Sequence, residues 1–560
     1  MVSFYTSVEQ IGNDILYRGY EKGKPVTKRV KFSPTLYIKT NNEDEATHAS
    51  LIGDNYLKPK HFETASQMRE FIERYKDVHG FGMYGSNSLI TQYIRDKFPG
   101  KIEYDPALIN LFQYDIEVNI SGEPQYADSI EVNVILFGEK ERITLGEMRR
   151  SHLLTMYKVE DEDGEFKPYA ETKWSKHINA KYPDVDTADQ EITAISIKSS
   201  KSERYTLLSL KGYDKKKTQS GIHPDLIDFF EFDDEKEMLR KFVRIWQNEY
   251  PEIITGWNVE FFDIQYTITR IIKLLGETTA NSLSPWGKLK KITVEKFGRQ
   301  QSSYKIYGMT VIDYMDAFKK FGYKYGPQES YKLDHIAHVV LGEKKLSYEE
   351  YGTLSKLWIF DPQLYNDYAL KDTKLIQRME EEAALIALIM TMAYQSGVNY
   401  SDTLGTVGIW ESTLYRKLML DNVVPNVKTG AGERANELVG GYVKPPRVGM
   451  SKWVVSFDLN SLYPHLMMQY NMGPDTIVHE LRQPVSVDMV ISGHYKNEEL
   501  PGYSVCANGA VFRNDQVGVI PAIIDEYYSR RSHVKKEMLS LESNEQSIKA
   551  ELEKRGLLEA

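Results

Sequence analysis

The sequence predicts a multidomain protein of the α/β (α+β) class, and three observations carry this prediction. Its 560 residues exceed the size at which a single hydrophobic core stops growing. Between residues 1 and 109, short β-like runs such as Thr35–Lys39 alternate with a helical stretch near Ala65 to Tyr75. From Glu191 to about residue 380, β-rich and helical segments follow one another, and a helical pattern runs from about Pro521 nearly to Ala560.

Composition is that of a globular protein from a reducing compartment. Apolar residues make up 41% and charged residues 27% of the chain. Cys506 is the single cysteine, which excludes a disulfide framework and argues against a structural zinc site. The N-terminus shows no basic segment followed by an apolar stretch, and the run Ala383 to Tyr394 is too short to span a bilayer. We therefore expect a cytoplasmic protein without a membrane partner, and a buried core helix at that run.

The formal net charge of −10 argues weakly against nucleic acid as a partner, because phosphate binding favours basic surfaces. A metal-dependent nuclease, however, concentrates carboxylates at its site, and basic patches can be local. The basic clusters are Lys288, Lys290 and Lys291, and later Arg530, Arg531, Lys535 and Lys536. Each can equally be a solvated face, so composition leaves the function open.

Two stretches interrupt the regular patterns. Residues 121 to about 190 are polar and read as irregular chain, including the acidic run Glu160–Glu165. Glycine and proline residues between Thr429 and Pro446 mark a boundary. An apolar strand is predicted after that boundary, at Trp453 to Phe457.

A strand predicted from Leu111 to Ile120 carries two carboxylates. The segment Tyr114–Val118 alternates with period two, so Asp115 and Glu117 project from the same face. Two carboxylates on one strand face suit a divalent metal, which prefers hard oxygen ligands. Alternating strands often carry polar faces, however, so this pair alone is a weak signal.

Two further pieces carry acidic residues. A strand-like Ile253-Ile254 runs into a turn at Gly256, and Asp263 follows near the start of a helix. Asp263 is either a ligand or an N-terminal helix charge. Tyr368 and Asp372 stand at i and i+4 and therefore share one helix face.

Together, in this order, the three pieces resemble the exonuclease motifs of family B DNA polymerases (D-x-E, N-x(2–3)-F-D and Y-x(3)-D), which are similar to the wider DEDDy nucleases. Gly256–Glu260, Val311–Asp316 and Ser330–Asp334 resemble segments of the polymerases of T-even-type bacteriophages. The resemblance covers most of the chain in order. Residues 121–190 are the exception and look like an insertion.

The resemblance implies an RNase H-like 3′→5′ proofreading exonuclease with two Mg²⁺ ions, or Mn²⁺ in their place. Two such ions about 3.5–4 Å apart activate a water and stabilise the leaving 3′-oxygen. The implied metal ligands are Asp115, Glu117, Asp263 and Asp372, with Asp115 bridging. Tyr368 would orient the attacking water, as the tyrosine does in similar enzymes.

The implied substrate is a frayed, single-stranded 3′ end, which aromatic side chains can hold by stacking. Asn258 and Phe262 are the predicted DNA contacts, and Phe261 is a further candidate. Packing in the core is the alternative use of both phenylalanines.

The segment Val454–Pro464 resembles the family's motif A, D-x-x-S-L-Y-P-S. By resemblance, Asp458 and the carbonyl of Leu459 hold Mg²⁺, and Tyr463 lies under the sugar of an incoming dNTP. Ser461 and Leu462 would meet its phosphates, since a tight turn exposes consecutive N–H groups there. The alternative is a plain strand that ends in a proline turn. His465 departs from the family, which usually has serine there.

Further resemblances flank motif A. Gly440, Gly441 and Tyr442 resemble the linker that contacts the template strand. The helix that follows Pro521 resembles the first fingers helix, on which Arg531 and Lys535 share a face and could clamp the triphosphate.

The fingers motif K-x(3)-N-S-x-Y-G and the second carboxylate motif Y-x-D-T-D are not found in the sequence. A two-metal polymerase needs a second aspartate opposite Asp458, so we expect that this chain alone does not polymerise. The expected partners are single-stranded and primer–template DNA, dNTP, and a second chain carrying the remaining palm, fingers and thumb. A sliding clamp would be reached through that second chain.

The resemblance gives expected domain limits, which are 1–109 (N-terminal domain, completed by 385–430), 110–384 (exonuclease, with the insertion 121–190), 431–515 (partial palm) and 516–560 (first fingers helix). The chain is expected to be either one subunit of a naturally split polymerase, located in the host cytoplasm if encoded by a phage, or a truncated form of a longer one. The rival functions are a non-catalytic DNA-binding or scaffolding subunit and a free-standing repair exonuclease. The intact set of four carboxylates and Tyr368 argues against the first rival, and Asp458–Pro464 argues against the second.

Overall fold

The computed structural model describes most of the chain, namely residues 2–53, 55–119, 130–151, 153–161, 163–172, 174, 183–296, 299–428, 442–495 and 500–557. The chain divides into two compact units. The first comprises Met1–Lys31 and Lys101–Ile409, and the second comprises Phe32–Gly100 and Trp410–Ala560. Within the described ranges, no helix is both long and apolar enough to cross a bilayer.

The first unit begins with an antiparallel three-stranded sheet of β1 (Phe4–Ile11), β2 (Asp14–Glu21) and β3 (Lys24–Lys31). This sheet packs on α13 (Leu385–Ser396), the helix expected from the apolar run. The Tyr5 hydroxyl donates to the carbonyl of Val398 at 2.6 Å, and the Tyr394 hydroxyl donates to the carbonyl of Tyr5 at 2.7 Å.

A mixed six-stranded sheet forms the centre of the first unit, with the strand order β15-β14-β13-β8-β16-β19. Its strands are β8 (Leu111–Val118), β13 (Ile192–Ser199), β14 (Tyr205–Ser209), β15 (Ile227–Glu231), β16 (Ile253–Gly256) and β19 (Thr310–Asp313). Strand β13 runs antiparallel to β8 and β14, whereas β16 runs parallel to β8 and β19.

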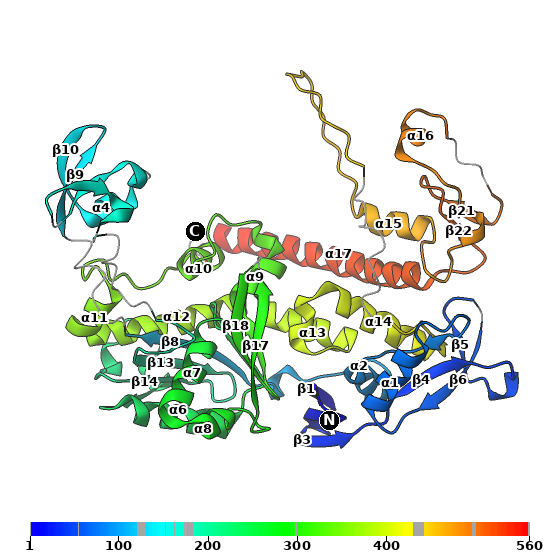
Figure 1. Ribbon diagram of the computed structural model, residues 1–560, viewed down its shortest axis with the longest axis horizontal. Coiled ribbons are helices and arrows are strands. Elements are labelled where there is room, and N and C mark those ends of the chain that lie inside the picture. The colour runs from blue at the N-terminus through cyan, green and yellow to red at the C-terminus, as the bar shows by residue number, and fades with distance from the viewer. Residues whose placement is uncertain are drawn as a thin grey trace. The chain divides into compact units, whose positions relative to one another are not determined.

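Helices cover both faces of this sheet (Figure 1). On one face, Phe112, Tyr114 and Ile116 of β8 join a core with α6 (Glu235–Glu249) and α7 (Asp263–Leu275). On the other face, buried residues of β13 and β14 pack against α11 (Leu354–Phe360) and α12 (Pro362–Ala383). Because side chains alternate along a strand, the residues of β8 between its apolar positions face away from α6 and α7.

The remaining elements of the first unit flank this sheet. They are α8 (Glu277–Asn281), the hairpin of β17 (Leu289–Lys296) and β18 (Arg299–Ile306), α9 (Tyr314–Phe321) and α10 (Leu333–Leu341). In β17, Lys291 of the basic cluster forms an ion pair with Asp186 at 2.7 Å.

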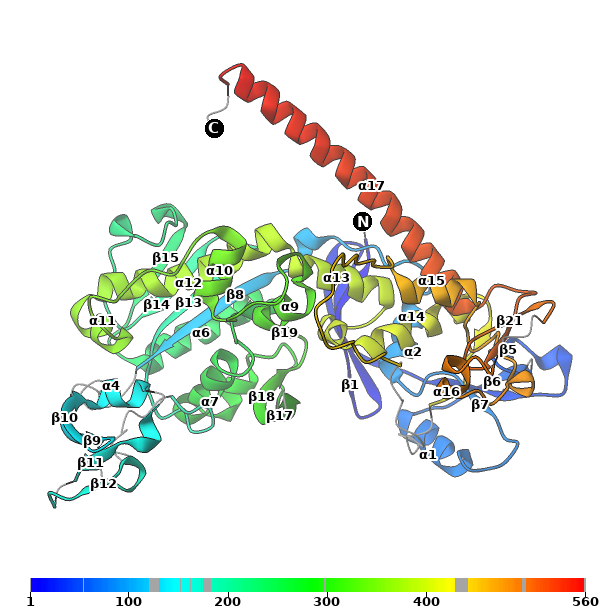
Figure 2. The same ribbon diagram turned by 90° about the horizontal axis from the view of Figure 1, so that it is seen from above.

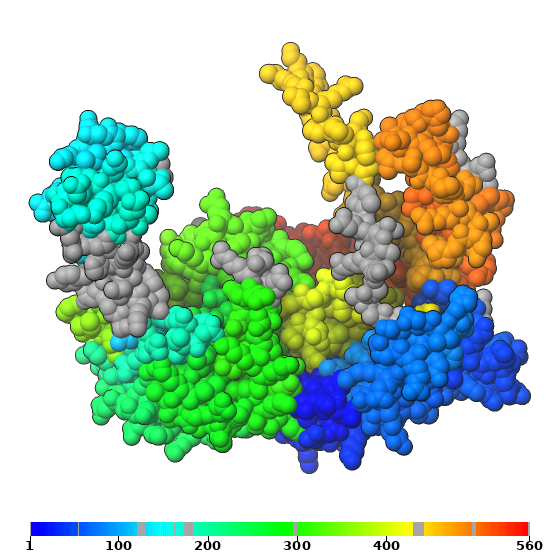
Figure 3. Space-filling view, in the orientation of Figure 1, coloured from blue at the N-terminus to red at the C-terminus, as the bar shows by residue number. Residues whose placement is uncertain are grey.

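The expectation of irregular chain over residues 121–190 is wrong for much of its described part. Residues 130–174 contain a four-stranded sheet of order β10-β9-β11-β12 and a short helix, visible as a compact cluster in Figure 3. The elements are β9 (Glu131–Leu136), β10 (Glu139–Thr144), α4 (Leu145–Arg150), β11 (Lys158–Glu160) and β12 (Phe166–Pro168). A hydrophobic core including Val132, Val134 and Leu145 holds them together. Of the acidic run, Glu160 ends β11, and Asp161, Asp163 and Glu165 lie between β11 and β12.

The second unit contains a five-stranded sheet of order β20-β5-β6-β4-β7. Its strands are β4 (Thr35–Lys39), β5 (His48–Ser50), β6 (Tyr56–His61), β7 (Met83–Tyr84) and β20 (Val423–Val424). The helices near it are α1 (Ala65–Tyr75), α2 (Leu89–Lys97) and α14 (Thr406–Leu420). Residues distant in sequence share its core, since Tyr37 and Leu57 pack with Tyr415 and Val424.

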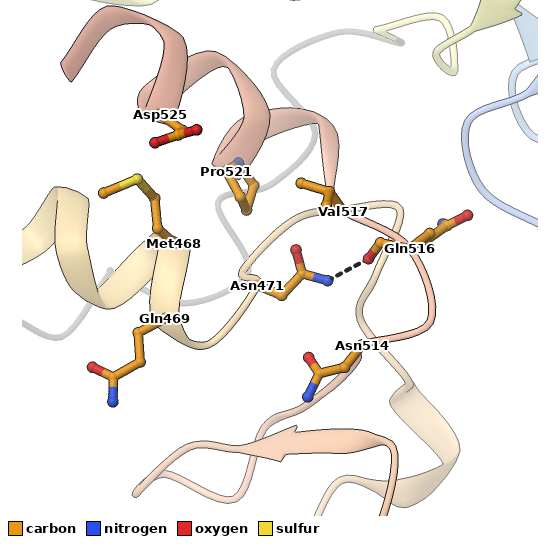
Figure 4. Close-up of a pocket in the computed structure, with 8 residues that line it drawn as sticks. All are labelled: Met468, Gln469, Asn471, Asn514, Gln516, Val517, Pro521 and Asp525. Carbon is orange, nitrogen blue, oxygen red and sulfur yellow. Dashed lines mark hydrogen bonds between the residues drawn. The ribbon is translucent and has the colours of Figure 1, made fainter. Parts of the chain in front are cut away.

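The C-terminal part of the second unit is dominated by α17 (Val519–Lys554), a single long helix in Figure 2 that matches the predicted helical pattern. It follows α15 (Leu462–Gln469), α16 (Val487–Ile491), β21 (Tyr503–Val505) and β22 (Val511–Arg513). The side chain of Asn471 ties down the start of α17, accepting from Gly518 N–H and donating to Gln516 O, each at 2.8 Å. Asn471 also lines a pocket of about 350 Å³ between α15 and α17 (Figure 4).

The strand predicted at Trp453 to Phe457 is absent from the structure. These residues form neither helix nor strand, and Trp453 and Phe457 are 97% and 90% exposed. A strand forms only beside a hydrogen-bonding neighbour, and no described residue pairs with this segment. The glycine-rich part of the predicted boundary before it lies outside the described residues.

Candidate metal centre and active site

Strand β8 places two carboxylates on the face of the sheet opposite to its apolar side chains. Tyr114 and Ile116 point into the core formed with α6 and α7. Asp115 and Glu117 therefore project toward α12, as the period-two pattern predicts. Glu117 is 8% exposed.

Helix α12 supplies the other side of this site. Tyr368 and Asp372, at i and i+4, are both buried on the helix face that meets the sheet. One carboxylate oxygen from each of Asp115, Glu117 and Asp372 lies within 4.8 Å of the others. Three carboxylates that are far apart in sequence are thus brought to one point.

Asp263 lies next to this cluster. It is the first residue of α7, as the sequence predicts, and is 3% exposed. Its Oδ1 accepts a hydrogen bond from the backbone N–H of Ile116 at 3.0 Å, which fixes it against β8 beside Asp115. Among the described residues, the group of carboxylate oxygens within 4.8 Å of one another comes from Asp115, Glu117 and Asp372, and it does not include Asp263.

Burial raises the pKa of all four carboxyl groups. For Asp115, Glu117 and Asp263, burial is the largest cause of the raised pKa and a neighbouring carboxylate is the next. Burial likewise raises the pKa of Asp372, and the ammonium of Lys345 opposes this rise. Acids in such surroundings either hold protons or are neutralised by nearby positive charge.

Lys345, which the sequence reasoning missed, supplies one positive charge. Its ammonium forms an ion pair with Asp372 at 2.5 Å and donates to the hydroxyl of Tyr368 at 2.9 Å. Burial acts to lower the pKa of Lys345, but Asp372 and Tyr368 outweigh it and the pKa is raised. No local pattern could have revealed this residue, because it stands in the loop between α10 and α11 and its contact spans 27 positions.

The buried oxygens fit a divalent cation. Oδ2 of Asp115 and Oδ1 of Asp372 are buried and have no hydrogen-bond partner among the described residues. Such orphaned acceptors are costly unless something neutralises them. Carboxylate oxygens are the ligands that Mg²⁺ and Mn²⁺ prefer. The donor set therefore suits either ion.

The two predicted DNA contacts of the exonuclease lie in different surroundings. Asn258 is exposed and adopts the left-handed conformation (φ 61°), held by its N–H bond to Oδ1 of Asp313 at 3.1 Å. Phe262 packs against the core and stacks on Tyr266, with 5.8 Å between the ring centroids. Phe262 thus packs against the core, and its contact with DNA stays a prediction.

The predicted polymerase residues lie in the second unit, mostly on its surface. Asp458, Leu459 and Tyr463 are exposed, and Ser461 adopts a left-handed conformation (φ 54°) directly before Leu462 opens α15.

Other predicted polymerase residues are also exposed. Arg531 and Lys535 are exposed on α17, and Tyr442 is 58% exposed. Gly440 and Gly441 lie outside the described residues. The roles assigned to these residues around Asp458 stay predictions.

His465, at the position where the family usually has serine, joins motif A to α17. Its Nδ1 lies 2.9 Å from the carbonyl oxygen of Ser461. Its ring meets that of Tyr528 edge-on, with 4.6 Å between centroids.

Two family profiles match the sequence. The profile described as "DNA polymerase family B, exonuclease domain" matches residues 156–336, and "DNA polymerase family B" matches residues 409–557. Together they account for more than half of the chain.

Individual relatives extend the match to nearly the whole chain. The DNA-directed DNA polymerase of Escherichia phage RB69 is 27% identical over 558 residues, 99% of this chain and 56% of the relative. That of Enterobacteria phage T4 is 26% identical over 98% of this chain and 55% of the relative. A DNA polymerase delta catalytic subunit of Glycine max is 26% identical over 56% of this chain. The chain thus spans about half the length of the phage relatives.

These matches bear out the predicted family resemblance and fold class. The mixed α/β architecture, the β-rich N-terminal region and the RNase H-like arrangement of the six-stranded sheet accord with the profile matches. The chain belongs to the family B DNA polymerases and carries sequence of both their exonuclease and their polymerase regions.

Proposed function

We propose that this chain is the 3′→5′ proofreading exonuclease part of a replicative phage DNA polymerase and contributes half of its polymerase site. The observation that carries the proposal is the buried convergence of Asp115, Glu117 and Asp372, beside Asp263 and with Tyr368 and Lys345 at its edge. We assign this chemistry to residues 110–384, with the other domain limits as predicted from the sequence.

In this proposal Asp115, Glu117, Asp263 and Asp372 hold divalent cations. Bound there, two cations would activate the attacking water and neutralise charge that develops on the phosphate and the leaving 3′-oxygen. Phosphoryl transfer asks mainly for positioning and charge neutralisation, so the proposal requires no protein nucleophile.

The remaining site residues position the water and the charges. Lys345 keeps a positive charge beside Asp372 and so favours its ionised form. The same ammonium donates to Tyr368, which fixes the direction of its hydroxyl. Burial raises the pKa of Tyr368, so the phenol stays neutral and can orient a water through its free lone pair and proton.

The polymerase half of the proposal rests on the motif A resemblance. Asp458 and the carbonyl of Leu459 would bind Mg²⁺ beside an incoming dNTP, and Arg531 and Lys535 would contact its triphosphate. A two-metal site needs a second aspartate. We therefore propose that primer extension requires residues that a second chain supplies. Contact with a sliding clamp belongs to the same second chain.

The test is degradation of a 5′-labelled single-stranded oligonucleotide with Mg²⁺, comparing the chain with Asp115→Ala/Glu117→Ala. Primer extension with dNTPs runs in parallel. Stepwise shortening from the 3′ end that the double variant loses, without extension, is the expected result. No shortening by the unmodified chain would contradict an autonomous exonuclease and favour a non-catalytic DNA-binding subunit. Extension by the single chain would contradict the need for further residues.

A further inference from the structure

Strand β13 carries a β-bulge directly opposite a predicted metal ligand. Ile192 pairs with Val118 and Ala194 pairs with Glu117, which leaves Thr193 as the extra residue between them. A bulge interrupts the hydrogen-bond ladder and commonly re-aims side chains next to an active site. Thr193 is nevertheless fully buried, so its hydroxyl needs partners.

The Thr193 hydroxyl finds two partners. Its Oγ1 donates to the backbone carbonyl of Glu117 at 3.0 Å and lies 2.6 Å from the hydroxyl of Tyr365. A threonine hydroxyl has one proton. Because that proton goes to Glu117, Tyr365 is the donor in the second bond. The two hydroxyls therefore form a chain of fixed direction that ends on the backbone of Glu117.

Tyr365 anchors this chain to the helix that carries the rest of the site. It precedes Tyr368 by three residues and Asp372 by seven, so all three share one face of α12. The Tyr365 ring is 2% exposed and packs against Trp358, with 4.9 Å between the centroids. Its position is thus fixed by packing.

A second hydroxyl bridge joins the same elements near the other carboxylates. The Thr373 hydroxyl donates to that of Ser196 at 2.8 Å. Thr373 follows Asp372 on α12, and Ser196 pairs with Asp115 across the sheet. Helix α12 and strand β13 are thus bridged at two points along the site.

The need for such an anchor follows from charge. Asp115 and Asp372 are the carboxylates that repel Glu117, and all three lie within 4.8 Å of one another. When the carboxylates are ionised, this repulsion favours movement of an unrestrained Glu117 side chain away from the site.

We propose that Thr193 and Tyr365 are positioning residues, which hold the backbone of Glu117 so that its carboxylate stays aimed at the cation site. This inference rests on the proposed function of that site. Neither residue is expected to touch substrate or cation. Outer-shell partners of this kind typically change metal affinity by about 10- to 100-fold when removed.

The test measures Mn²⁺ binding by calorimetry on the full chain, without DNA. Thr193→Val removes the hydroxyl but keeps the branched shape, and Tyr365→Phe removes only the phenolic oxygen. We expect each to weaken Mn²⁺ binding by about tenfold, and Thr193→Ser, which keeps the hydroxyl, to restore it. In the nuclease assay the Mg²⁺ concentration for half-maximal rate should rise by the same factor, while the rate at saturating Mg²⁺ changes less.

A matched control is available in the same sheet. Thr255 is fully buried in β16, and its hydroxyl donates to the carbonyl of Ile312 in the neighbouring strand at 2.7 Å. Thr255→Val deletes an equivalent bond that does not lead to Glu117, so Mn²⁺ binding should be unchanged.

Three results would overturn the inference. The first is that folded Thr193→Val and Tyr365→Phe bind Mn²⁺ as tightly as the unmodified chain, and the second is that the unmodified chain does not bind Mn²⁺. The third is that both variants unfold although Thr255→Val stays folded. Mn²⁺ binding that depends on Thr193 and Tyr365, in a chain that does not shorten DNA, would instead reject the proposed exonuclease and leave the positioning role intact.

Discussion

Lys345 sets the charge balance of the carboxylate cluster. It lowers the pKa of Asp372 against the effect of burial and donates to the hydroxyl of Tyr368. In Lys345→Met both effects are lost, so Asp372 is protonated more readily and Tyr368 loses its orientation. We expect single-turnover shortening of DNA at pH 7 to slow by about 10- to 100-fold.

Raising the pH should restore part of that activity, because a higher pH deprotonates Asp372 without help from a cation. Lys198→Met is the control, since Lys198 is also buried in this sheet but pairs with Glu203 at 2.8 Å. An unchanged rate in Lys345→Met would show that the contact has no part in the reaction.

The raised carboxyl pKa values predict how stability depends on pH in the absence of metal. The usual pKa of an aspartate is 3.8, and that of Asp115 is raised to about 8. Between these values the folded state binds more protons than the unfolded state, so the free energy of unfolding falls as the pH rises. The fall is at most about 1.4 kcal/mol per pH unit for each such group.

This dependence is measured by urea unfolding at pH 6, 7 and 8 in a chelator. Asp115→Asn should flatten the curve, and Mn²⁺ should raise stability most at pH 8, because the cation replaces the protons. Stability that rises with pH in the chelator would contradict the raised pKa values.

Much of the site could be predicted from residue periodicity. Strand alternation placed Asp115 and Glu117 on one face, and helix periodicity placed Tyr368 and Asp372 on another. Lys345 and Thr193 could not be found in this way. The first acts from a loop across 27 positions and the second from a bulge, and neither contact leaves a short-range pattern.

At the level of elements, the sequence predicted those helices and strands whose formation depends on neighbouring residues in the chain. It did not predict those that depend on contacts with distant residues. The helices α1 and α17 follow their sequence patterns closely. The strand expected at Trp453 to Phe457 does not form, because a strand also needs a pairing neighbour. The small sheet within residues 130–174 was not predicted because most of its residues are polar. Its alternation of exposed and buried residues is short, with Val132 and Val134 buried in β9.

This inserted sheet is expected to be dispensable for the nuclease. Its core residues form a cluster separate from the two cores of the six-stranded sheet. Replacing residues 120–182 by a flexible glycine–serine linker removes it and keeps Asn119, whose N–H bonds to the carbonyl of Glu191. The variant should fold and shorten single-stranded DNA at a rate within about twofold of the unmodified chain, as expected for independent parts.

The same linker combined with Asp115→Ala should be inactive, which excludes a contaminating nuclease. A folded linker variant without activity would show that the insertion contributes to substrate binding or to the site. Loss of folding would show that its core supports the larger sheet.

At the scale of the whole molecule, the two units carry different proposed chemistries. The exonuclease residues from Asp115 to Asp372 lie in the first unit, and Asp458 and Arg531 lie in the second. The chain passes between the units after Lys31, after Gly100 and after Ile409. A single cut therefore cannot separate them, and point substitutions are the appropriate test of their independence.

We expect Asp458→Ala to leave the shortening of single-stranded DNA within about twofold of the unmodified rate, because Asp458 belongs to the second unit and the proposed exonuclease ligands belong to the first. Asp115→Ala/Glu117→Ala should abolish shortening, and a chelator should do the same to the unmodified chain. Circular dichroism of each variant checks that it is folded. The contrast between the variants is decisive, since both remove acidic residues proposed to bind metal. An equal loss of shortening in folded Asp458→Ala would mean that motif A takes part in cleavage, and that the two units do not divide the chemistry between them.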